Sequence, residues 1–350
     1  MHNKIWRKIA YVLFILALLG GAVALFKLRR SEFRWDVFAA TLVQLDWAWL
    51  SCAVVLVYLT YVGRALRWRV MLLPLRPHPN FMNLLSSTII GFTAIVLFGR
   101  PGEVVRPYLI ASREKVPFSS QMAAWLLERI YDLLIVLLLF GFALSQFDQT
   151  TPPTEMGPAM RFVFHVGGRI VAGACLGCLL VLALSSLYLP VFSKRLAEAL
   201  EFLPKKWHKR AHEFIDSFVT GLESTRSHTS VFLILSYTIV EWLIIVASTY
   251  FLLRSVPATS SLRWLDGLVI VGFIAFGSIV QLPGVGGGSQ IATTVVLTEL
   301  YGLPLEVSTG IAVLMWLVTF VSIVPIGLGL AAHEGLNWGK LRHIELEEKK

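Results

Sequence analysis

Apolar residues in this chain fall into blocks of about the length that a bilayer requires. Six blocks run without interruption: Ile9 to Leu28, Trp47 to Gly63, Ser119 to Leu144, Val166 to Phe192, Val231 to Leu253 and Val307 to Ala332. A helix that spans the hydrocarbon core needs roughly 20 such residues. The pattern predicts six membrane-spanning helices. The first is expected to be retained, because its apolar stretch is too long for a signal sequence and no small-residue cleavage site follows.

Two further apolar regions are interrupted by glycine and proline. Phe81 to Phe98 leads into Gly99-Arg100-Pro101-Gly102-Glu103-Val104-Val105-Arg106-Pro107. Leu262 to Leu282 leads into Pro283-Gly284-Val285-Gly286-Gly287-Gly288-Ser289-Gln290 and a short apolar limb to Leu300. Broken backbone at membrane depth is tolerated only where protein or a water-filled cavity covers it. We expect each region to form a re-entrant helical hairpin.

Basic residues between the blocks indicate how the chain is threaded. They form three clusters: Lys4, Arg7 and Lys8; Arg64, Arg67, Arg69 and Arg76; and Lys194, Arg195, Lys205, Lys206, Lys209 and Arg210. The positive-inside rule places such clusters in the cytoplasm. This requires both interrupted regions to enter and leave by one face, with Arg29, Arg30 and Arg34 as exceptions. Both termini are then cytoplasmic, and the loop from Gln146 to His165 lies outside.

The same threading divides the chain into two halves. Residues 9–144 and 166–332 each follow the order helix, helix, hairpin, helix, and three crossings per half invert the second half. The expected fold is an all-α polytopic membrane protein, a single transmembrane domain over residues 1–350. It has six full spans plus two re-entrant hairpins in an inverted repeat, about eight membrane segments. Residues 145–165 form the outer loop, 193–229 a cytoplasmic amphipathic segment and 333–350 a short cytoplasmic tail. The alternative is that the two Gly/Pro breaks correspond by chance.

Composition agrees with a membrane protein and limits other classes. Of 350 residues, 56% are hydrophobic and 15% charged, against about 25% charged in soluble chains. The formal net charge of +9 does not indicate nucleic-acid binding, because the basic residues lie where anionic head groups would meet them. The cysteines, Cys52, Cys175 and Cys178, lie in apolar blocks without partners at ligand spacing. We expect no metal and no cofactor.

Ionisable residues inside the apolar blocks mark a candidate site. Glu128, Arg129 and Asp132 lie near the middle of one block, and Glu241 lies alone in another. Each costs at least roughly 2.5 to 3.5 kcal/mol at a helix centre. The two acids, four residues apart, share a helical face, and Arg129 can pair with Asp132. They form either a polar cavity wall, with surplus negative charge unless Arg100 or Arg106 joins them, or a neutralising network between helices.

The first Gly-rich turn offers cations that could meet those acids. Arg100, Glu103 and Arg106 are spaced by three, so a helical limb would put them on one side. Two arginines and a glycine turn can cradle a phosphate, and snorkelling to head groups is the alternative. Glu241 could couple protons, pair with a hairpin arginine or stay neutral. The predicted substrate-binding residues are Arg100, Glu103, Arg106, Glu128, Arg129, Asp132, Glu241, Gln281 and Gln290, with backbone positions Pro101, Gly102, Pro283, Gly284, Gly286, Gly287 and Gly288.

Three motifs in this order resemble a flippase-like integral membrane family. They are Gly99 to Pro107, Glu128-Arg129-Ile130-Tyr131-Asp132 and Leu282 to Gly288. The best-known member is the transmembrane domain of lysylphosphatidylglycerol synthase, and the resemblance covers residues 5–335. It implies an inner-membrane protein of the cell envelope that moves an anionic or polyprenyl-type lipid between leaflets. Where the family usually has an acidic residue after the second turn, this chain has Ser289 and Gln290.

We therefore expect a lipid translocase of the cytoplasmic membrane rather than an enzyme, because the chain has no room for the aminoacyl-transfer domain of the synthase. Its partners would be membrane lipids, with a lipid-modifying enzyme and an oligomer left open. One alternative is a membrane-embedded transferase acting on a lipid-linked substrate, but the first outer loop offers only Glu32 and Asp36 as acids. The other is an accessory subunit of a lipid- or glycan-modifying enzyme.

Overall fold

The computed structural model describes residues 33–146, 166, 168–177, 228–278, 281, 282, 284 and 286–335. The expected span from Ile9 to Leu28, the outer loop from residue 147 to 165, the amphipathic segment up to residue 227 and the tail from residue 336 lie outside them. Of the predicted span from Val166 to Phe192, the described part is helical.

The described helices follow the predicted apolar blocks closely. They are α2 (Trp35–Val43), α3 (Trp47–Leu72), α4 (Phe81–Phe98), the 3-10 turn η1 (Arg100–Val104), α5 (Val105–Glu114), α6 (Phe118–Ser145), α10 (His228–Ser255), η5 (Pro257–Thr259), α11 (Trp264–Gly277), α12 (Gly288–Glu299), α13 (Leu305–Trp316), the π-helical η6 (Leu317–Val321) and α14 (Val324–His333). Four described segments are long and apolar enough to cross a membrane: α3, α4, Thr229–Ser255 and Leu305–His333. The chain is thus a helical membrane protein, and the number of spans stays a prediction.

One helix end differs from the prediction. The second apolar block was expected to stop at Gly63, with Arg64, Arg67 and Arg69 in a cytoplasmic loop, but α3 continues to Leu72. Their assignment to a loop is wrong, because all three lie in α3. No glycine or proline lies between Gly63 and Leu72, so nothing there ends the helix. Arg67 is buried in this part of α3 and forms ion pairs with carboxylates of a neighbouring helix.

Both interrupted regions form pairs of short helices joined by a turn. In the first pair, α4 and α5 pack together on either side of η1. A Cβ atom at Gly91 of α4 would lie 2.5 Å from the Cβ atom of Arg106, so glycine permits this approach. In the second pair, α11 and α12 flank strands β1 (Gln281–Leu282) and β2 (Gly286–Gly287), which pair antiparallel.

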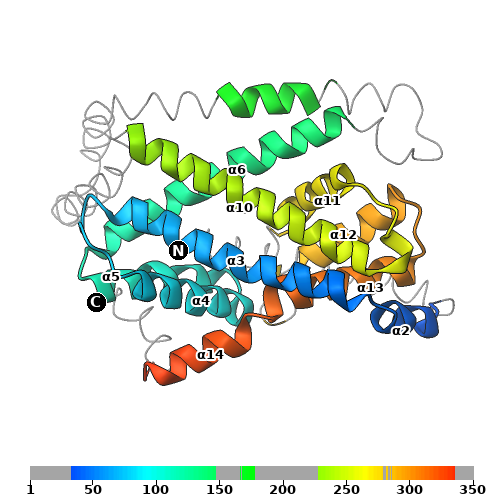
Figure 1. Ribbon diagram of the computed structural model, residues 1–350, viewed down its shortest axis with the longest axis horizontal. Coiled ribbons are helices and arrows are strands. Elements are labelled where there is room, and N and C mark those ends of the chain that lie inside the picture. Colours follow the sequence, from blue (N-terminus) through cyan, green and yellow to red (C-terminus); the bar gives the residue numbers. More distant parts are fainter. Residues whose placement is uncertain are drawn as a thin grey trace, which may run out of the picture.

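The open ends of these two hairpins lie at opposite ends of the molecule (Figure 1). At one end, Glu114 of α5 accepts a hydrogen bond from the Asn80 N–H before α4 and pairs with Arg76 after α3, each at 3.3 Å. At the other end, the Asp46 N–H before α3 donates to the Ser255 carbonyl at the end of α10, at 2.8 Å. The hairpins therefore run toward each other.

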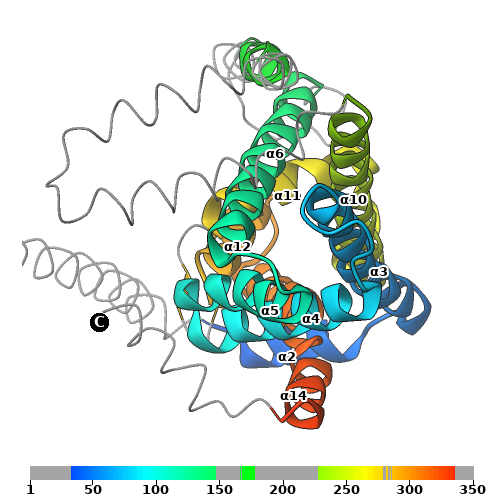
Figure 2. The same cartoon turned by 90° about the vertical axis from the view of Figure 1, so that its left-hand side faces the viewer.

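The turns of the two hairpins meet in the middle. The Gly284 N–H donates to the Val96 carbonyl at the end of α4, at 2.9 Å. Arg100 of η1 donates to the Ser278 carbonyl after α11, at 3.0 Å. Viewed along the long axis, α6 and α10 lie above α4 and α5, and α14 lies below them (Figure 2).

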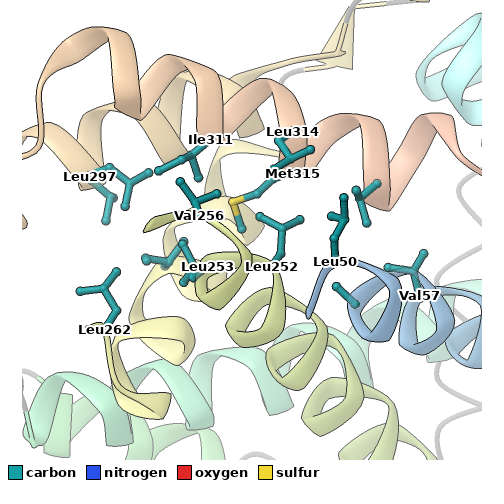
Figure 3. Close-up of a cluster of buried hydrophobic side chains, with 14 of the residues drawn as sticks. Leu50, Val57, Leu252, Leu253, Val256, Leu262, Leu297, Ile311, Leu314 and Met315 are labelled. Carbon is teal, nitrogen blue, oxygen red and sulfur yellow. The ribbon is translucent and has the colours of Figure 1, made fainter. Parts of the chain in front are cut away.

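Apolar clusters hold the long helices against the hairpins. The largest joins α3 and α10 to α11, α12 and α13, with Leu252, Val256, Leu297 and Ile311 among its buried members (Figure 3). A second joins the end of α3 to α5, α6 and α10 around Trp68. The second cluster thus packs the long helices against the first hairpin.

Candidate functional site

A cavity of about 260 Å³ lies where the two turns meet the long helices. Its wall comes from α3, α4, η1, α6, α10, α11, α12, α13 and η6. Its polar members are Thr60, Tyr61, Arg64, Arg100, Glu103, Arg129, Asp132, Trp242, Ser248, Thr249, Ser278, Ser289, Gln290, Thr293, Trp316 and Thr319. The interior of the apolar bundle thus contains a space in which charged and hydrogen-bonding groups converge.

Arg67 is the centre of a buried charge network beside this cavity. It donates to Asp132 at 2.7 Å, to the Thr238 hydroxyl at 3.0 Å and to Glu128, and it lies 3.4 Å from Glu241. Its side chain is 1% exposed. A buried charge is tolerated only where opposite charges and hydrogen bonds compensate it. Carboxylates of α6 and α10 supply that compensation to α3.

Asp132 therefore pairs with Arg67 rather than with Arg129, its neighbour on α6. Glu128 and Asp132 do share the helical face that their spacing predicted, since both contact the same guanidinium. The local pairing of Arg129 with Asp132 does not form among the described residues, because Arg67 approaches that face from α3.

Arg106 joins the first hairpin to the network. It donates to both oxygens of Glu128, one at 3.3 Å, and its Cζ atom lies 4.1 Å from the centre of the Trp68 ring. Its side chain is 3% exposed, so it does not snorkel to head groups. The Arg106 guanidinium, which was expected to help bind a phosphate, is therefore already bound to Glu128.

Arg100 and Glu103 form a separate pair at the cavity wall, 2.6 Å apart. The spacing predicted that Arg106 would share their side, but Arg106 turns toward Glu128 instead. Arg106 lies in α5, beyond the end of η1, where it contacts Glu128 of α6.

Glu241 meets two arginines of α3 rather than one of the hairpin. It lies 2.7 Å from Arg64 and 3.4 Å from Arg67, and neither contact has hydrogen-bonding geometry. The Arg64 guanidinium also lies over the Phe92 ring, 4.6 Å from its centre. The partner of Glu241 is therefore α3, which the charge pattern alone did not indicate.

Charge in the described site has a positive surplus. Four arginines (Arg64, Arg67, Arg106 and Arg129) face three carboxylates (Glu128, Asp132 and Glu241), leaving one positive charge, while Arg100 and Glu103 cancel. The negative surplus that was expected unless Arg100 or Arg106 joined the acids does not arise, because Arg106 binds Glu128 and α3 contributes two further arginines.

The second turn meets the cavity through Gln290 and Ser289 at the start of α12. The Gln290 Oε1 atom accepts hydrogen bonds from the Gly287 N–H at 2.6 Å and from the Ser289 hydroxyl at 3.1 Å. Gly286 has φ +94°, and a Cβ atom there would overlap the Gln290 side chain. Glycine is therefore favoured at this point of the second turn, because φ +94° strains other residues.

The other predicted backbone positions divide between the turns. Pro101 and Gly102 belong to η1, where a Cβ atom at Gly102 would overlap the Ala94 carbonyl of α4. Gly284 contacts α4 and Gly288 begins α12. The Gln281 backbone pairs with Gly287, whereas its side chain and all of Pro283 lie outside the described residues.

Sequence reasoning missed two parts of the site. Arg64 and Arg67 were assigned to a loop, although the absence of a helix breaker before Leu72 was a usable signal. The predicted span from Val307 to Ala332 contains the π-helical segment η6, and its residues Thr319 and Phe320 line the cavity. Such segments are frequent at functional sites, but no residue pattern marked this one.

Comparison with known proteins gives a family. The family model described as the lysylphosphatidylglycerol synthase TM region matches residues 10–327, nearly the whole chain. Searches of curated proteins and of solved structures found no match. The multi-pass helical fold and this match agree with the motif resemblance. The chain belongs to the family of the lysylphosphatidylglycerol synthase TM region.

Proposed function

We propose that this protein is a lipid translocase, which moves an anionic phospholipid or a polyprenyl-phosphate-type lipid between the leaflets of the cytoplasmic membrane. The observation that supports this most is the cavity between the two hairpin turns. It has a net positive charge among the described residues and lies inside an apolar bundle. Interrupted helices that meet at the midplane are typical of transporter sites.

The opposed hairpins fit an inverted repeat made of residues 9–144 and 166–332. Each hairpin would enter the membrane from one face and return to it, and the two turns would meet at mid-depth, as the Gly284 to Val96 hydrogen bond supports. Both halves then contribute to one site, which can open toward either leaflet in turn.

The charges at the two ends of the molecule favour one orientation. Among the described residues at the open end of the α4–α5 hairpin, basic side chains are in the majority: Arg69, Arg76, Arg113 and Lys115 against Glu114 and Glu334. At the opposite end acidic side chains are in the majority: Asp36, Asp46, Asp266, Glu299 and Glu306 against Arg34, Arg169, Arg254 and Arg263. The positive-inside rule places the first end in the cytoplasm. Both chain termini would then also be cytoplasmic.

The size of the cavity fits a head group rather than a whole lipid. Pockets that enclose drug-sized ligands measure about 300–1,000 Å³, and this one measures about 260 Å³. We propose that the head group crosses through the cavity while the acyl chains remain in the bilayer.

The test is lipid movement in vesicles that contain the purified full-length protein. Vesicles with a fluorescent phosphatidylglycerol should expose nearly all of it to an impermeant quencher, whereas protein-free vesicles should expose only the outer half. Ala275→Trp fills the cavity wall and should slow the exchange, while Ile291→Trp, on an exposed face of α12, should not. Equal quenching with and without protein would contradict the proposal.

A further inference from the structure

The last apolar segment of the described chain, Leu305–His333, is divided between the two hairpins. Its first part, α13, packs against α12 of the second hairpin and against α2. Its last part, α14, packs mainly on α4 of the first hairpin and lies at the margin of the bundle (Figures 1 and 2). A movement of one hairpin relative to the other must therefore be taken up between α13 and α14.

The contact between α14 and α4 is a narrow stripe of small residues. A Cβ atom at Gly327 would overlap the Thr93 side chain of α4. Ala331, one turn further along α14, is fully buried against the first hairpin. Ile326 and Leu328, on other sides of α14, are 44% and 38% exposed. Small-residue contacts in a bilayer depend largely on van der Waals packing, so little contact area fixes this helix.

The end of α14 is fastened to the first hairpin by an ion pair. Glu334, the residue that follows α14, pairs with Arg113 of α5. Arg113 is anchored on α4, because it donates to the hydroxyl groups of Ser86 at 2.7 Å and of Ser87 at 2.8 Å. The Arg113 and Glu334 side chains are 17% and 28% exposed, and ion pairs that water can reach are weak. The pair can therefore hold α14 in place and also release it.

The segment between α13 and α14 has the features of a hinge. In η6 the Ser322 N–H donates to the Leu317 carbonyl, five residues back, at 2.9 Å, where an α-helix would use the residue four back. Pro325, near the start of α14, has no N–H to continue the helical hydrogen bonds. The Tyr58 hydroxyl of α3 donates to the Ser322 carbonyl at 3.0 Å and fixes the position of the segment. Helices bend at π segments and prolines, so α14 can rotate here while α13 stays in place.

Rotation at η6 would change the cavity wall. Trp316 ends α13, and Thr319 and Phe320 lie in η6; all three line the cavity. On the other side of this contact, the wall residues Ile95 and Val96 lie in the turn of α4 that follows the stripe under α14. A second space, of about 10 Å³, is lined by these two residues together with Trp316 and Phe320. The wall is thus incompletely packed where η6 meets α4.

We infer that α14 is a gate on the cytoplasmic side of the cavity. It swings about η6, away from α4, and opens the wall between η6 and α4 to the cytoplasmic leaflet, while the pair of Arg113 and Glu334 holds it closed. The inference rests on the proposed function, which places the open end of the α4–α5 hairpin in the cytoplasm and a head-group route in the cavity. The arrangement with α14 on α4 is then the closed state of this gate.

The first experiment locks the gate reversibly. Arg113→Cys and Glu334→Cys are combined in a cysteine-free full-length protein and joined by a short bis-methanethiosulfonate, whose disulfides can be reduced. Lipid movement in vesicles should fall to the level of protein-free vesicles, and reduction should restore it, which excludes misfolding as the cause. The matched control joins Arg76→Cys to Glu114→Cys, an ion pair of 3.3 Å at the same end of the molecule that does not involve α14. This second link should leave lipid movement unchanged.

The second experiment releases the gate and measures its opening without lipid movement. A single cysteine at Thr319, in the cavity wall, reacts with a small impermeant thiol reagent in inside-out vesicles. Glu334→Gln removes the ion pair and should speed this labelling by up to roughly fivefold, the change that a partly exposed pair of about 1 kcal/mol produces. Glu299→Gln, at an exposed position at the opposite end of the molecule, should leave the rate unchanged.

The outcomes separate the gate from the proposed function. Cross-linked protein that moves lipid as fast as the reduced protein would overturn the gate even though translocation is observed. Equal labelling of position 319 with and without Glu334→Gln would also overturn it. If no form moves lipid, faster labelling with Glu334→Gln still supports the gate and contradicts translocation.

Discussion

Replacing Arg67 by leucine should reveal how strongly the buried charge network stabilises the bundle. Leucine forms helices well, so α3 should persist. The change removes both hydrogen bonds, of 2.7 and 3.3 Å, that Asp132 accepts from Arg67. It also removes the hydrogen bond from Arg67 to Glu128, although Arg106 still donates to Glu128. Removing one partner of a buried ion pair costs about 3–5 kcal/mol. We expect a loss of free energy of unfolding in that range.

The measurement is reversible unfolding of the purified protein in mixed micelles at increasing SDS fraction. Arg69→Leu makes the same change two residues away at an exposed position, and it should cost within about 0.5 kcal/mol. Adding Asp132→Leu to Arg67→Leu should recover stability, because no unpaired carboxylate then remains at that position. If Arg67→Leu costs no more than Arg69→Leu, the network does not stabilise the fold and this reasoning is refuted.

Three further predictions concern the turns and the threading. Arg100→Gln breaks the contacts to Glu103 and to the Ser278 carbonyl, so lipid movement should fall by roughly tenfold while the melting temperature stays near wild type; normal movement would remove Arg100 from the mechanism. Gly286→Val should stop lipid movement, because φ +94° costs a branched residue about 1–3 kcal/mol; Gly286→Ala, which adds the Cβ atom alone, should be milder, and an active valine variant would refute this. Single cysteines at Thr151 and Lys206, in a cysteine-free background, should react with an impermeant reagent from opposite faces of the membrane, and labelling of both from one face would contradict the threading.

Helix ends were predictable where local chemistry determines them. The block predicted from Phe81 to Phe98 has the bounds of α4. Asn80 caps its first turn by accepting a hydrogen bond from the Met82 N–H at 2.9 Å, and Gly99 ends it with φ +71°, a conformation that glycine adopts without strain. Both signals are local, so the sequence contains them.

The partners within the site were not predictable in the same way. Glu128 and Asp132 were found from their cost inside an apolar helix, but Arg67 is 65 residues away from Asp132 in the chain. A rule based on local charge assigns an arginine after an apolar block to the cytoplasm. Only the packing of α3 against α6 and α10 shows that the same residue neutralises buried acids.

The most direct test of the account is to ask which lipid lies in the cavity. The photoreactive residue benzoyl-phenylalanine would replace Trp316, in the cavity wall, or Phe276, on an exposed face of α11, in full-length protein reconstituted with one part phosphatidylglycerol to about nine parts phosphatidylcholine. After illumination, the captured lipids are identified by mass spectrometry. We predict that position 316 captures phosphatidylglycerol well above its share of the bilayer, while position 276 captures lipids in proportion to the mixture. Capture in proportion at both positions, or no capture at position 316, would contradict an anionic-lipid site between the hairpins.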